Sequence, residues 1–206
     1  MSYEAEGIDL AAMDDDPIVQ FQSWFVDAQE SVDPEPYAMV LSTVDASGQP
    51  RGRMVLLRGV TTAGFVFYTD YTSSKAQEIE HSGRAALTFH WHSLHRQVRV
   101  AGVVSQVAPE VSDAYFAGRP RGSQLGAWAS DQSAELASRA DLVSRLDEVT
   151  ARFEGSEVSR PPDWGGYQLR PLELEFWQGQ PSRLHDRLRY ARSSEDSDWD
   201  RSLLNP

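Results

Sequence analysis

The chain contains no cysteine, a single lysine and no long hydrophobic run among its 206 residues. The absence of cysteine excludes disulfide bonds, thiolate metal sites and a cysteine nucleophile. No apolar run approaches the roughly 20 residues that cross a membrane as a helix. The N-terminus also lacks the basic and then apolar layout of a secretory signal. From these absences we expect a cytoplasmic protein, and from the length of 206 residues one domain or at most two.

Positive charge is absent from the N-terminal part of the chain. Residues 1–50 hold eleven Asp and Glu and no Lys or Arg, whereas the remaining 156 residues hold twenty acidic and nineteen basic side chains. The formal net charge of −12 therefore belongs to the N-terminal segment. Because the chain has no separate basic domain or basic tail, nucleic acid is not an expected partner. The clustered arginines of the body remain suited to a small anionic ligand.

Short strands separated by turn residues dominate the middle of the sequence. We expect a mobile acidic segment over residues 1–15, followed by a single domain over residues 16–206. Asp16-Pro17 has the form of a helix N-cap followed by proline, and it predicts a helix to about Gln29. Strands are predicted at 38–44, 51–58, 65–69, 84–91 and 97–107 and after Trp164, and helices at 73–81, 108–118 and about 134–154, with a polar loop before the last helix. This succession favours an antiparallel barrel or sandwich with flanking helices over a βαβ sheet.

An unusual pattern of arginines lies near the C-terminus. Read as a strand, the stretch that ends at Tyr190 alternates with period two. Arg183, His185, Arg187 and Arg189 then share one face, and Leu184, Leu188 and Tyr190 share the other. Guanidinium groups on one face repel one another and are costly to desolvate without partners. On this stretch alone, an edge strand kept soluble by charge is the simpler interpretation. The alternative is a site built around a phosphate or a carboxylate.

Three earlier segments are further candidates for binding sites. His90 and His92 share a strand face, as two metal ligands can, but no carboxylate is near in sequence and a metal site is not favoured. Ser73-Ser74-Lys75 at a helix start offers backbone N–H groups, a hydroxyl and the only lysine to a phosphate, although serine is also common there as an ordinary cap. The segment 115–133 is rich in hydroxyls, amides and arginines, which suits either a ligand or an exposed loop.

Distinctive short segments follow one another from about Pro36 to Pro206. They are Arg53-Met-Val-Leu-Leu, Phe67-Tyr68-Thr69, Ser74-Lys75-Ala76, Arg96-Gln97-Val98, Arg119-Pro-Arg121-x-Ser123-Gln-x-Gly-Ala-Trp128, Gln132-Ser133, Trp164-Gly-Gly, Glu175-Phe-Trp177-Gln-Gly and Arg183-Leu-His185-Asp-Arg187. Together and in this order, they resemble the successive signatures of the pyridoxine/pyridoxamine 5′-phosphate oxidase family. The last two segments are the most specific.

The resemblance implies an antiparallel Greek-key split β-barrel that binds FMN, and a homodimer with the flavin in clefts at the subunit interface. The implied flavin contacts are Arg53, Met54, Val55, Leu56, Leu57, Tyr68, Thr69, Ser74, Lys75, Gln97, Gln132, Ser133, Trp177 and Arg187. The implied substrate contacts are Arg58, Tyr115, Arg119, Ser123, Arg183 and His185, of which Arg183 and His185 are the implied catalytic residues. Under this resemblance, Arg53 and Lys75 would hold the flavin phosphate, and the arginine face near the C-terminus would meet flavin and substrate.

The reaction that the resemblance implies is the oxidation of pyridoxine or pyridoxamine 5′-phosphate to pyridoxal 5′-phosphate, with O2 reduced to hydrogen peroxide. The chain departs from the family at Arg58 and Ser74, where lysine and arginine are common, and residues 1–35 hold no arginine. Two alternatives follow. One is an oxidase of the same fold that acts on another anionic aromatic substrate in secondary metabolism. The other is a non-catalytic protein that binds flavin or a vitamer.

Overall fold

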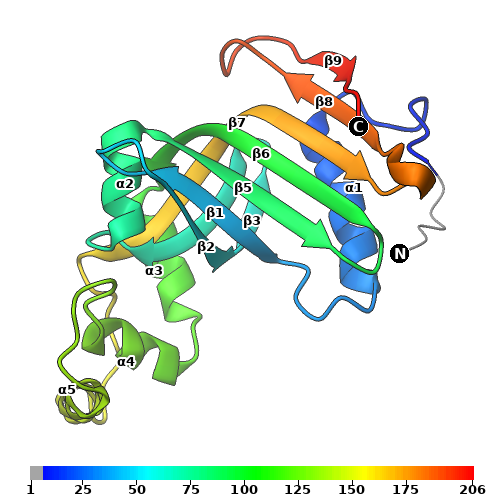
Figure 1. Ribbon diagram of the computed structural model, residues 1–206. Helices are drawn as coiled ribbons and strands as arrows, with labels where there is room; N and C mark the ends of the chain where they lie inside the picture. The colour runs from blue at the N-terminus through cyan, green and yellow to red at the C-terminus, as the bar shows by residue number, and fades with distance from the viewer. Residues whose placement is uncertain (1–6) are drawn as a thin grey trace.

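The computed structural model describes residues 7–206 and is organised around one antiparallel sheet (Figure 1). Among these residues, nine strands are hydrogen-bonded in the order β2-β1-β5-β6-β7-β4-β3, with β8 paired to β7 and β9 paired to β8. The strands are β1 (Ala38–Val44), β2 (Pro50–Leu56), β3 (Gly59–Thr61), β4 (Gly64–Asp70), β5 (Arg84–Trp91), β6 (Arg96–Gln106), β7 (Trp164–Gln178), β8 (Asp186–Ala191) and β9 (Asp200–Leu203). The helices are α1 (Pro17–Glu30), α2 (Ser74–Ser82), α3 (Pro109–Ala117), α4 (Arg121–Ala129) and α5 (Arg139–Arg152), with a short 3-10 turn η1 (Pro181–Arg183).

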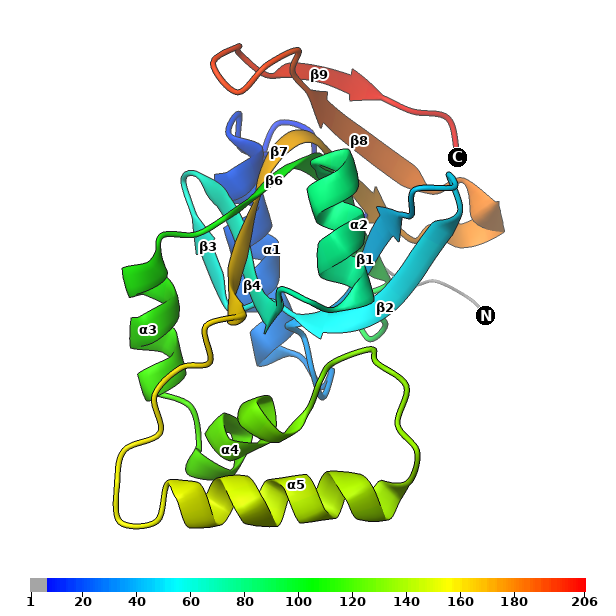
Figure 2. The same ribbon diagram turned by 90° about the vertical axis from the view of Figure 1, so that its left-hand side faces the viewer.

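Alternation of apolar and polar residues gives the sheet one buried face. In β5, for example, Phe89 is fully buried and the next residue, His90, is exposed. Helix α1 packs on the buried face, where the Phe21 ring lies 4.8 Å from that of Phe65. Burying a phenylalanine side chain in this way stabilises the fold by roughly 1.5–3 kcal/mol. Figure 2 shows α1 along the curled sheet, α2 between β4 and the β1–β2 hairpin, α3 at the left beside the sheet, and α4 and α5 beneath it.

Several helix boundaries follow the predicted capping signals. Helix α1 begins after Asp16, whose carboxylate accepts a hydrogen bond from the backbone N–H of Ile18 at 2.8 Å. Helix α2 ends at Gly83, which has the left-handed conformation (φ 65°) that glycine adopts without steric cost. Ser73 precedes α2 but does not cap it, because its hydroxyl donates to the Asp70 carbonyl oxygen at 2.6 Å instead.

The prediction of a polar loop between α3 and α5 is wrong, because residues 121–129 form helix α4. Gly122 and Gly126 weaken the helical pattern in the sequence. Packing decides the conformation: Leu125 is buried in a small cluster with Phe116, Phe153 and Trp164. The following helix, α5, begins later than predicted, after Ser138, whose hydroxyl accepts from the backbone N–H of Asp141 at 3.2 Å.

The late arginine stretch is also only partly a strand. β8 begins at Asp186, and the residues before it form the turn η1, in which Ser182 and Arg183 have φ values of 59° and 63°. Pro181 at the start of this turn cannot donate to a strand ladder, which is a physical reason for the break. Arg183 and His185 therefore do not share a strand face with the later arginines. Within β8 the predicted alternation is confirmed, since Leu188 and Tyr190 are buried.

The predicted strand 51–58 ends early as well. β2 ends at Leu56, and the hydrogen bonds then change sides of the sheet. The N–H of Leu57 donates to the carbonyl oxygen of Tyr37 before β1, whereas the N–H of Arg58 donates to that of Val66 in β4. Arg58 therefore lies at the junction between the two halves of the sheet.

The N-terminal segment is described from Gly7 onward, so residues 1–6 lie outside the described residues. Its later part contacts the body: Met13 is buried in the main core, and the Tyr190 hydroxyl donates to the Asp14 carbonyl oxygen at 2.7 Å. The mobility of residues 1–15 and the domain boundary at residue 16 remain predictions. None of the helices in residues 7–206 is long and apolar enough to cross a membrane.

Candidate active site

A cleft of about 790 Å³ lies between β2, β4 and the helices α3 and α4. Most of the residues predicted to hold flavin and the substrate phosphate line this one cleft. They are Met54, Val55, Leu56, Arg58, Tyr68, Thr69, Lys75, Tyr115, Arg119, Ser123 and Gln132. Segments that are up to 78 residues apart in sequence are thus brought together by the β2–β4 half of the sheet and the α3–α4 turn.

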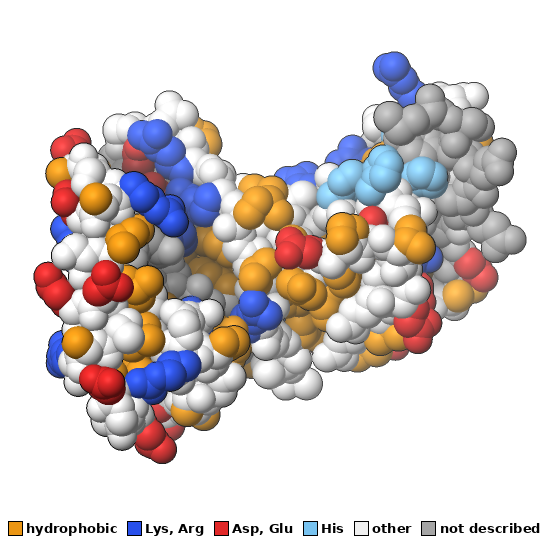
Figure 3. Space-filling model, turned by 90° about the horizontal axis from the view of Figure 1, so that it is seen from below, with side chains coloured by type: hydrophobic (Ala, Val, Ile, Leu, Met, Phe, Trp, Pro, Cys, Tyr) orange, Lys and Arg blue, Asp and Glu red, His pale blue; other side chains and the backbone are white. Residues whose placement is uncertain are grey.

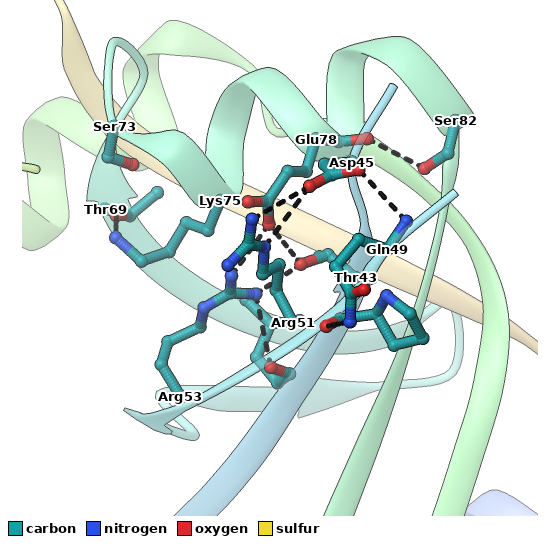
Figure 4. Close-up of polar contacts among 12 residues, drawn as sticks. Thr43, Asp45, Gln49, Arg51, Arg53, Thr69, Ser73, Lys75, Glu78 and Ser82 are labelled. Carbon is teal, nitrogen blue, oxygen red and sulfur yellow. Dashed lines mark hydrogen bonds and ion pairs between the residues drawn. The ribbon is translucent and has the colours of Figure 1, made fainter. Parts of the chain in front are cut away.

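One end of the cleft is built around Lys75, the only lysine of the chain. Lys75 lies in the first turn of α2 and is 9% exposed. Its Nζ donates to Thr69 Oγ1 at 3.1 Å (Figure 4). It also donates to Gln132 Oε1 at 2.7 Å. Burial lowers the pKa of Lys75, and the Arg53 charge lowers it further, while Asp70 and Glu78 act in the opposite direction. A buried ammonium with neutral oxygen partners and a second cation nearby is suited to an anion.

Arg53 lies beside this end but does not line the cleft itself. It faces Leu41 across the β1–β2 ladder, and its Nη2 donates to Glu78 Oε2 at 2.7 Å. Its Nη1 donates to the Thr43 hydroxyl, and that hydroxyl in turn donates to Glu78. Figure 4 shows Arg53, Thr43 and Glu78 as one hydrogen-bonded group next to Lys75. Arg53, which was predicted to hold the flavin phosphate, is therefore already paired with a carboxylate.

A stack of aromatic rings forms one wall of the cleft. The Tyr68 and Tyr115 rings are nearly parallel with centroids 3.8 Å apart, and Trp164 stacks on Tyr68 at 5.5 Å. The glycines after Trp164 make this packing feasible. A Cβ on Gly166 would lie 2.9 Å from the Tyr68 ring, and one on Gly165 would lie 2.2 Å from the hydroxyl of Tyr71.

Two guanidinium groups form the other charged end of the cleft. The Cζ atom of Arg119 lies 4.5 Å from the centre of the Trp164 ring. Burial lowers the pKa of Arg119; Tyr115 raises it, and the charge of Arg58 lowers it. Among the described residues, Arg119 Nη1 is buried without a hydrogen-bond partner. Because an unpaired buried donor is unfavourable, this atom favours an anionic ligand that would complete its hydrogen bonding.

A second group of predicted residues lies on the exposed face of β6, β7 and β8. Gln97 pairs with Trp177 across β6 and β7, and Trp177 pairs with Arg187 across β7 and β8, so the three side chains form one row. His185 lies beside the row, with its ring 4.6 Å from that of Trp177, and Arg183 is exposed in the preceding turn. None of these five residues lines the cleft.

The arginines of β8 have carboxylate partners in β7, which corrects the first interpretation of this stretch. Arg187 Nε donates to Glu175 Oε1 at 2.9 Å, and Arg99 Nη1 donates to Glu175 Oε2 at 3.3 Å. Arg189 lies 3.7 Å from Glu173. β8 is also not an edge strand, because it pairs with both β7 and β9. The charges are therefore tolerated partly through ion pairs inside the sheet.

The remaining predicted positions lie outside the cleft. Leu57 is buried in the core, Ser74 is exposed at the start of α2, and Ser133 is in a loop with φ 74°. The His90 and His92 rings are 5.8 Å apart, and Figure 3 shows histidine side chains close together on the surface. Across residues 7–206, no group of three or more His, Cys, Asp or Glu side chains could hold a metal ion.

Three residues that touch the site were not predicted as site residues. Glu78 follows Lys75 by one helical turn, and this spacing places both side chains on one face of α2. Glu175 alternates with Trp177 in β7 and so shares its face. Trp164 was part of a recognised segment without an assigned role. Helical and strand spacing therefore contained the signal for both carboxylates.

The fold is shared with solved protein structures. The chain superimposes on PhzG from Burkholderia lata, solved with tetrahydrophenazine-1-carboxylic acid, with a TM-score of 0.92, 30% identity and 100% coverage of both chains. A pyridoxamine 5′-phosphate oxidase-related, FMN-binding protein from Nostoc punctiforme matches with a TM-score of 0.72 and 18% identity, over 94% of this chain and 100% of the other. The protein therefore has the split-barrel fold of these proteins, as the sequence resemblance implied.

Sequence comparisons identify the family within that fold. Residues 25–153 match the family model of pyridoxamine 5′-phosphate oxidase, and residues 164–206 match the C-terminal dimerisation region of pyridoxine 5′-phosphate oxidase. Proteins named pyridoxine/pyridoxamine 5′-phosphate oxidase are 49% identical over 205 residues in Paraburkholderia phytofirmans and 50% identical over 206 residues in Burkholderia mallei, each covering 100% of this chain and 96% of the relative. The chain belongs to the pyridoxine/pyridoxamine 5′-phosphate oxidase family. The match to the dimerisation region indicates a homodimer.

Proposed function

We propose that the protein is an FMN-dependent oxidase that converts pyridoxine 5′-phosphate and pyridoxamine 5′-phosphate to pyridoxal 5′-phosphate, with O2 reduced to hydrogen peroxide. The observation that carries the proposal is a single cleft lined by cations in two groups: Lys75, whose neighbouring charge is Arg53, and Arg119, whose neighbouring charge is Arg58. A flavin phosphate and a substrate phosphate need two such groups. The aromatic wall between them suits stacked rings.

The chain supplies the groups that FMN requires. Lys75 and Arg53 would hold the flavin phosphate, because their charges lie close enough for Arg53 to lower the pKa of Lys75. Thr69 and Gln132 fix Lys75 in place through their oxygens. The β2 segment 54–56 would border the flavin along the cleft. In the homodimer, the row Gln97–Trp177–Arg187 from the second copy would close the site.

The substrate phosphate would bind at the opposite end of the cleft. Arg119 offers a buried, unpaired N–H, and Ser123 and Tyr115 line the same region. Binding energy from this remote phosphate can position the carbon that reacts. FMN bound in the cleft would accept a hydride from the 4′ carbon of the substrate and would be reoxidised by O2.

The turn before β8 would complete the site from the second copy. Arg183 is exposed and has φ 63°, a conformation that is unfavourable for a residue other than glycine. Such conformations are maintained where function requires a side chain to point in a particular direction. Arg183 would hold the substrate ring from above, and His185, whose Nδ1 accepts from the N–H of Gln180 at 3.0 Å, would orient it.

A direct assay tests the proposal. The purified protein is reconstituted with FMN and incubated with pyridoxine 5′-phosphate, and pyridoxal 5′-phosphate and hydrogen peroxide are measured by absorbance and by a peroxidase-coupled dye. Equimolar amounts of both products are expected. Flavin that binds but is not reduced anaerobically by either phosphorylated vitamer would contradict the proposal and favour a non-catalytic binding protein.

A second candidate is an oxidase for another anionic aromatic substrate. The observation that favours it is the close structural match to PhzG, which was solved with an aromatic carboxylic acid derivative, together with Arg58, whose planar fork can bind a carboxylate at two points. Flavin reduction by a cyclic carboxylic acid, combined with inactivity towards pyridoxine 5′-phosphate, would favour this candidate.

A further inference from the structure

A buried carboxylate, Glu78, lies at the cationic end that we assign to the flavin phosphate. Glu78 is 8% exposed and follows Lys75 by one turn of α2. Its Oε2 accepts from Arg53 Nη2 at 2.7 Å and also from the Thr43 hydroxyl. Figure 4 shows this carboxylate pointing towards Arg53, on the same side of α2 as the Lys75 side chain. A negative group in this place opposes the binding of a phosphate.

The contacts of Glu78 also determine how Arg53 is held. Arg53 uses Nη2 for Glu78 and Nη1 for Thr43 and the Leu41 carbonyl oxygen, so both terminal nitrogens are fixed from one side. A guanidinium carries five N–H donors, and donors remain for a further anion. A residue that only orients Arg53 could equally be a glutamine, because glutamine offers an acceptor oxygen of the same reach. The carboxylate adds a charge to this arrangement.

The neighbouring charges show how the negative charge of Glu78 affects this end of the cleft. Lys75 and Arg53 contribute two positive charges, and Glu78 cancels one of them. The Glu78 charge acts on Lys75 directly, because it raises the pKa of that lysine against the effect of burial. In a buried site such charges are weakly screened by salt and act strongly on a bound anion.

We propose that Glu78 is a positioning residue with two opposed effects on the cofactor: it orients Arg53 towards the phosphate, and its charge weakens phosphate binding so that the cofactor can exchange. This proposal rests on the proposed FMN site. The family resemblance gave no role to Glu78. In the proposal, the acceptor oxygen of Glu78 orients Arg53, and the negative charge of Glu78 weakens phosphate binding.

Two substitutions separate these effects. Glu78→Gln keeps the acceptor oxygen and removes the charge, so the dissociation constant of FMN should fall about fivefold, which corresponds to roughly 1 kcal/mol. Glu78→Asp keeps the charge but withdraws the carboxylate by one methylene, so FMN should bind more weakly than to the unaltered protein. Both constants are measured on the apoprotein by quenching of flavin fluorescence.

Riboflavin and a matched variant provide the controls. Riboflavin lacks the phosphate, so its dissociation constant should be the same in all variants. Glu80→Gln removes the same charge from the same helix, at an exposed carboxylate that bonds Tyr167 rather than Arg53, and FMN affinity should not change.

Each other outcome has a definite meaning. If Glu78→Gln leaves FMN affinity unchanged or weakens it, the charge does not oppose the phosphate and the proposal is wrong. If both flavins change equally, Glu78 has only a structural role. Should Glu78→Gln fail to fold, Glu78→Asp decides, because tighter FMN binding by that variant contradicts the proposed orientation. If the unaltered protein binds neither flavin, the proposed function itself fails, which is a different result.

Discussion

Replacing Arg119 by methionine tests whether the second cationic end is built for a phosphate. The substitution keeps an unbranched stem against the Trp164 ring and removes the guanidinium, which has one buried nitrogen without a hydrogen-bond partner among residues 7–206. Because this nitrogen lacks a partner until a ligand binds, Arg119 should lower the stability of the protein without substrate. Catalysis and stability should therefore respond in opposite directions.

The magnitudes follow from the two roles of the guanidinium. A buried donor without a partner costs about 1–3 kcal/mol. The contact of the cation with the ring offsets part of this by about 0.5–2 kcal/mol, and a thioether on the same ring recovers a similar contact. We therefore expect Arg119→Met to stabilise the free protein by about 1 kcal/mol, or about 2–4 °C in Tm. A lost charge-assisted contact with phosphate costs about 3 kcal/mol, so kcat/KM should fall roughly a hundredfold.

The assay combines thermal unfolding of the protein without substrate with steady-state kinetics on pyridoxine 5′-phosphate. Arg121→Met is the matched control, because Arg121 donates to the carbonyl oxygens of Ser156 and Phe153 at 2.9 and 2.7 Å and does not line the cleft. That variant should lose stability and keep kcat/KM. An Arg119→Met protein that is less stable and equally active would refute the assignment of this end to the substrate phosphate.

Three further predictions concern the other parts of the site. Burial and the Arg53 charge lower the pKa of Lys75 below the ordinary lysine value of 10.5. FMN affinity, measured by fluorescence titration at increasing pH, should therefore begin to fall below pH 10.5, as Lys75 loses its proton. An affinity that stays constant up to pH 10.5 would contradict this. Glu175→Gln should destabilise the protein by about 2 kcal/mol. This is less than the roughly 3–5 kcal/mol lost when a fully buried ion pair is broken, because the arginine partners of Glu175 are partly exposed. An unchanged Tm would show that these ion pairs do not stabilise the protein. Arg183→Ala should reduce kcat much more than flavin retention, and equal losses of both would move Arg183 to the flavin site.

The strands of the sheet could be predicted from the sequence because their side chains alternate. β5 was predicted with its observed bounds, since every second residue from Ala85 to Trp91 is buried. Helix α4 could not be predicted in this way, because two glycines lower its intrinsic propensity and its apolar side reaches only a small cluster. The turn before β8 was missed because its arginine and histidine happen to continue the period of the strand.

The cleft could be predicted only in part. Composition pointed to Lys75, since a single lysine among eighteen arginines at a helix start is unusual, and the structure places it among most of the predicted contacts. The partners of the arginines were missed. The sequence showed clustered cations and suggested that ligands neutralise them, whereas Glu78 and Glu175 neutralise Arg53 and Arg187 within the chain. Spacing shows which residues share a face, but the pairs become evident only when neighbouring elements are in place.

The charges that remain after this internal pairing give a physical reason for a site shared between two copies. The cleft retains the cations Lys75, Arg58 and Arg119. On β6 to β8, Arg99 and Arg187 share the single carboxylate of Glu175, so this group of three side chains retains one net positive charge. Two positive surfaces repel each other when they approach. Two phosphates, each carrying about −1.5 to −2 charges at neutral pH, would reverse that repulsion if they lay between the surfaces. In the proposed dimer, the cofactor and the substrate are therefore expected to strengthen the interface that holds them, and the free protein should dissociate more readily than the loaded one.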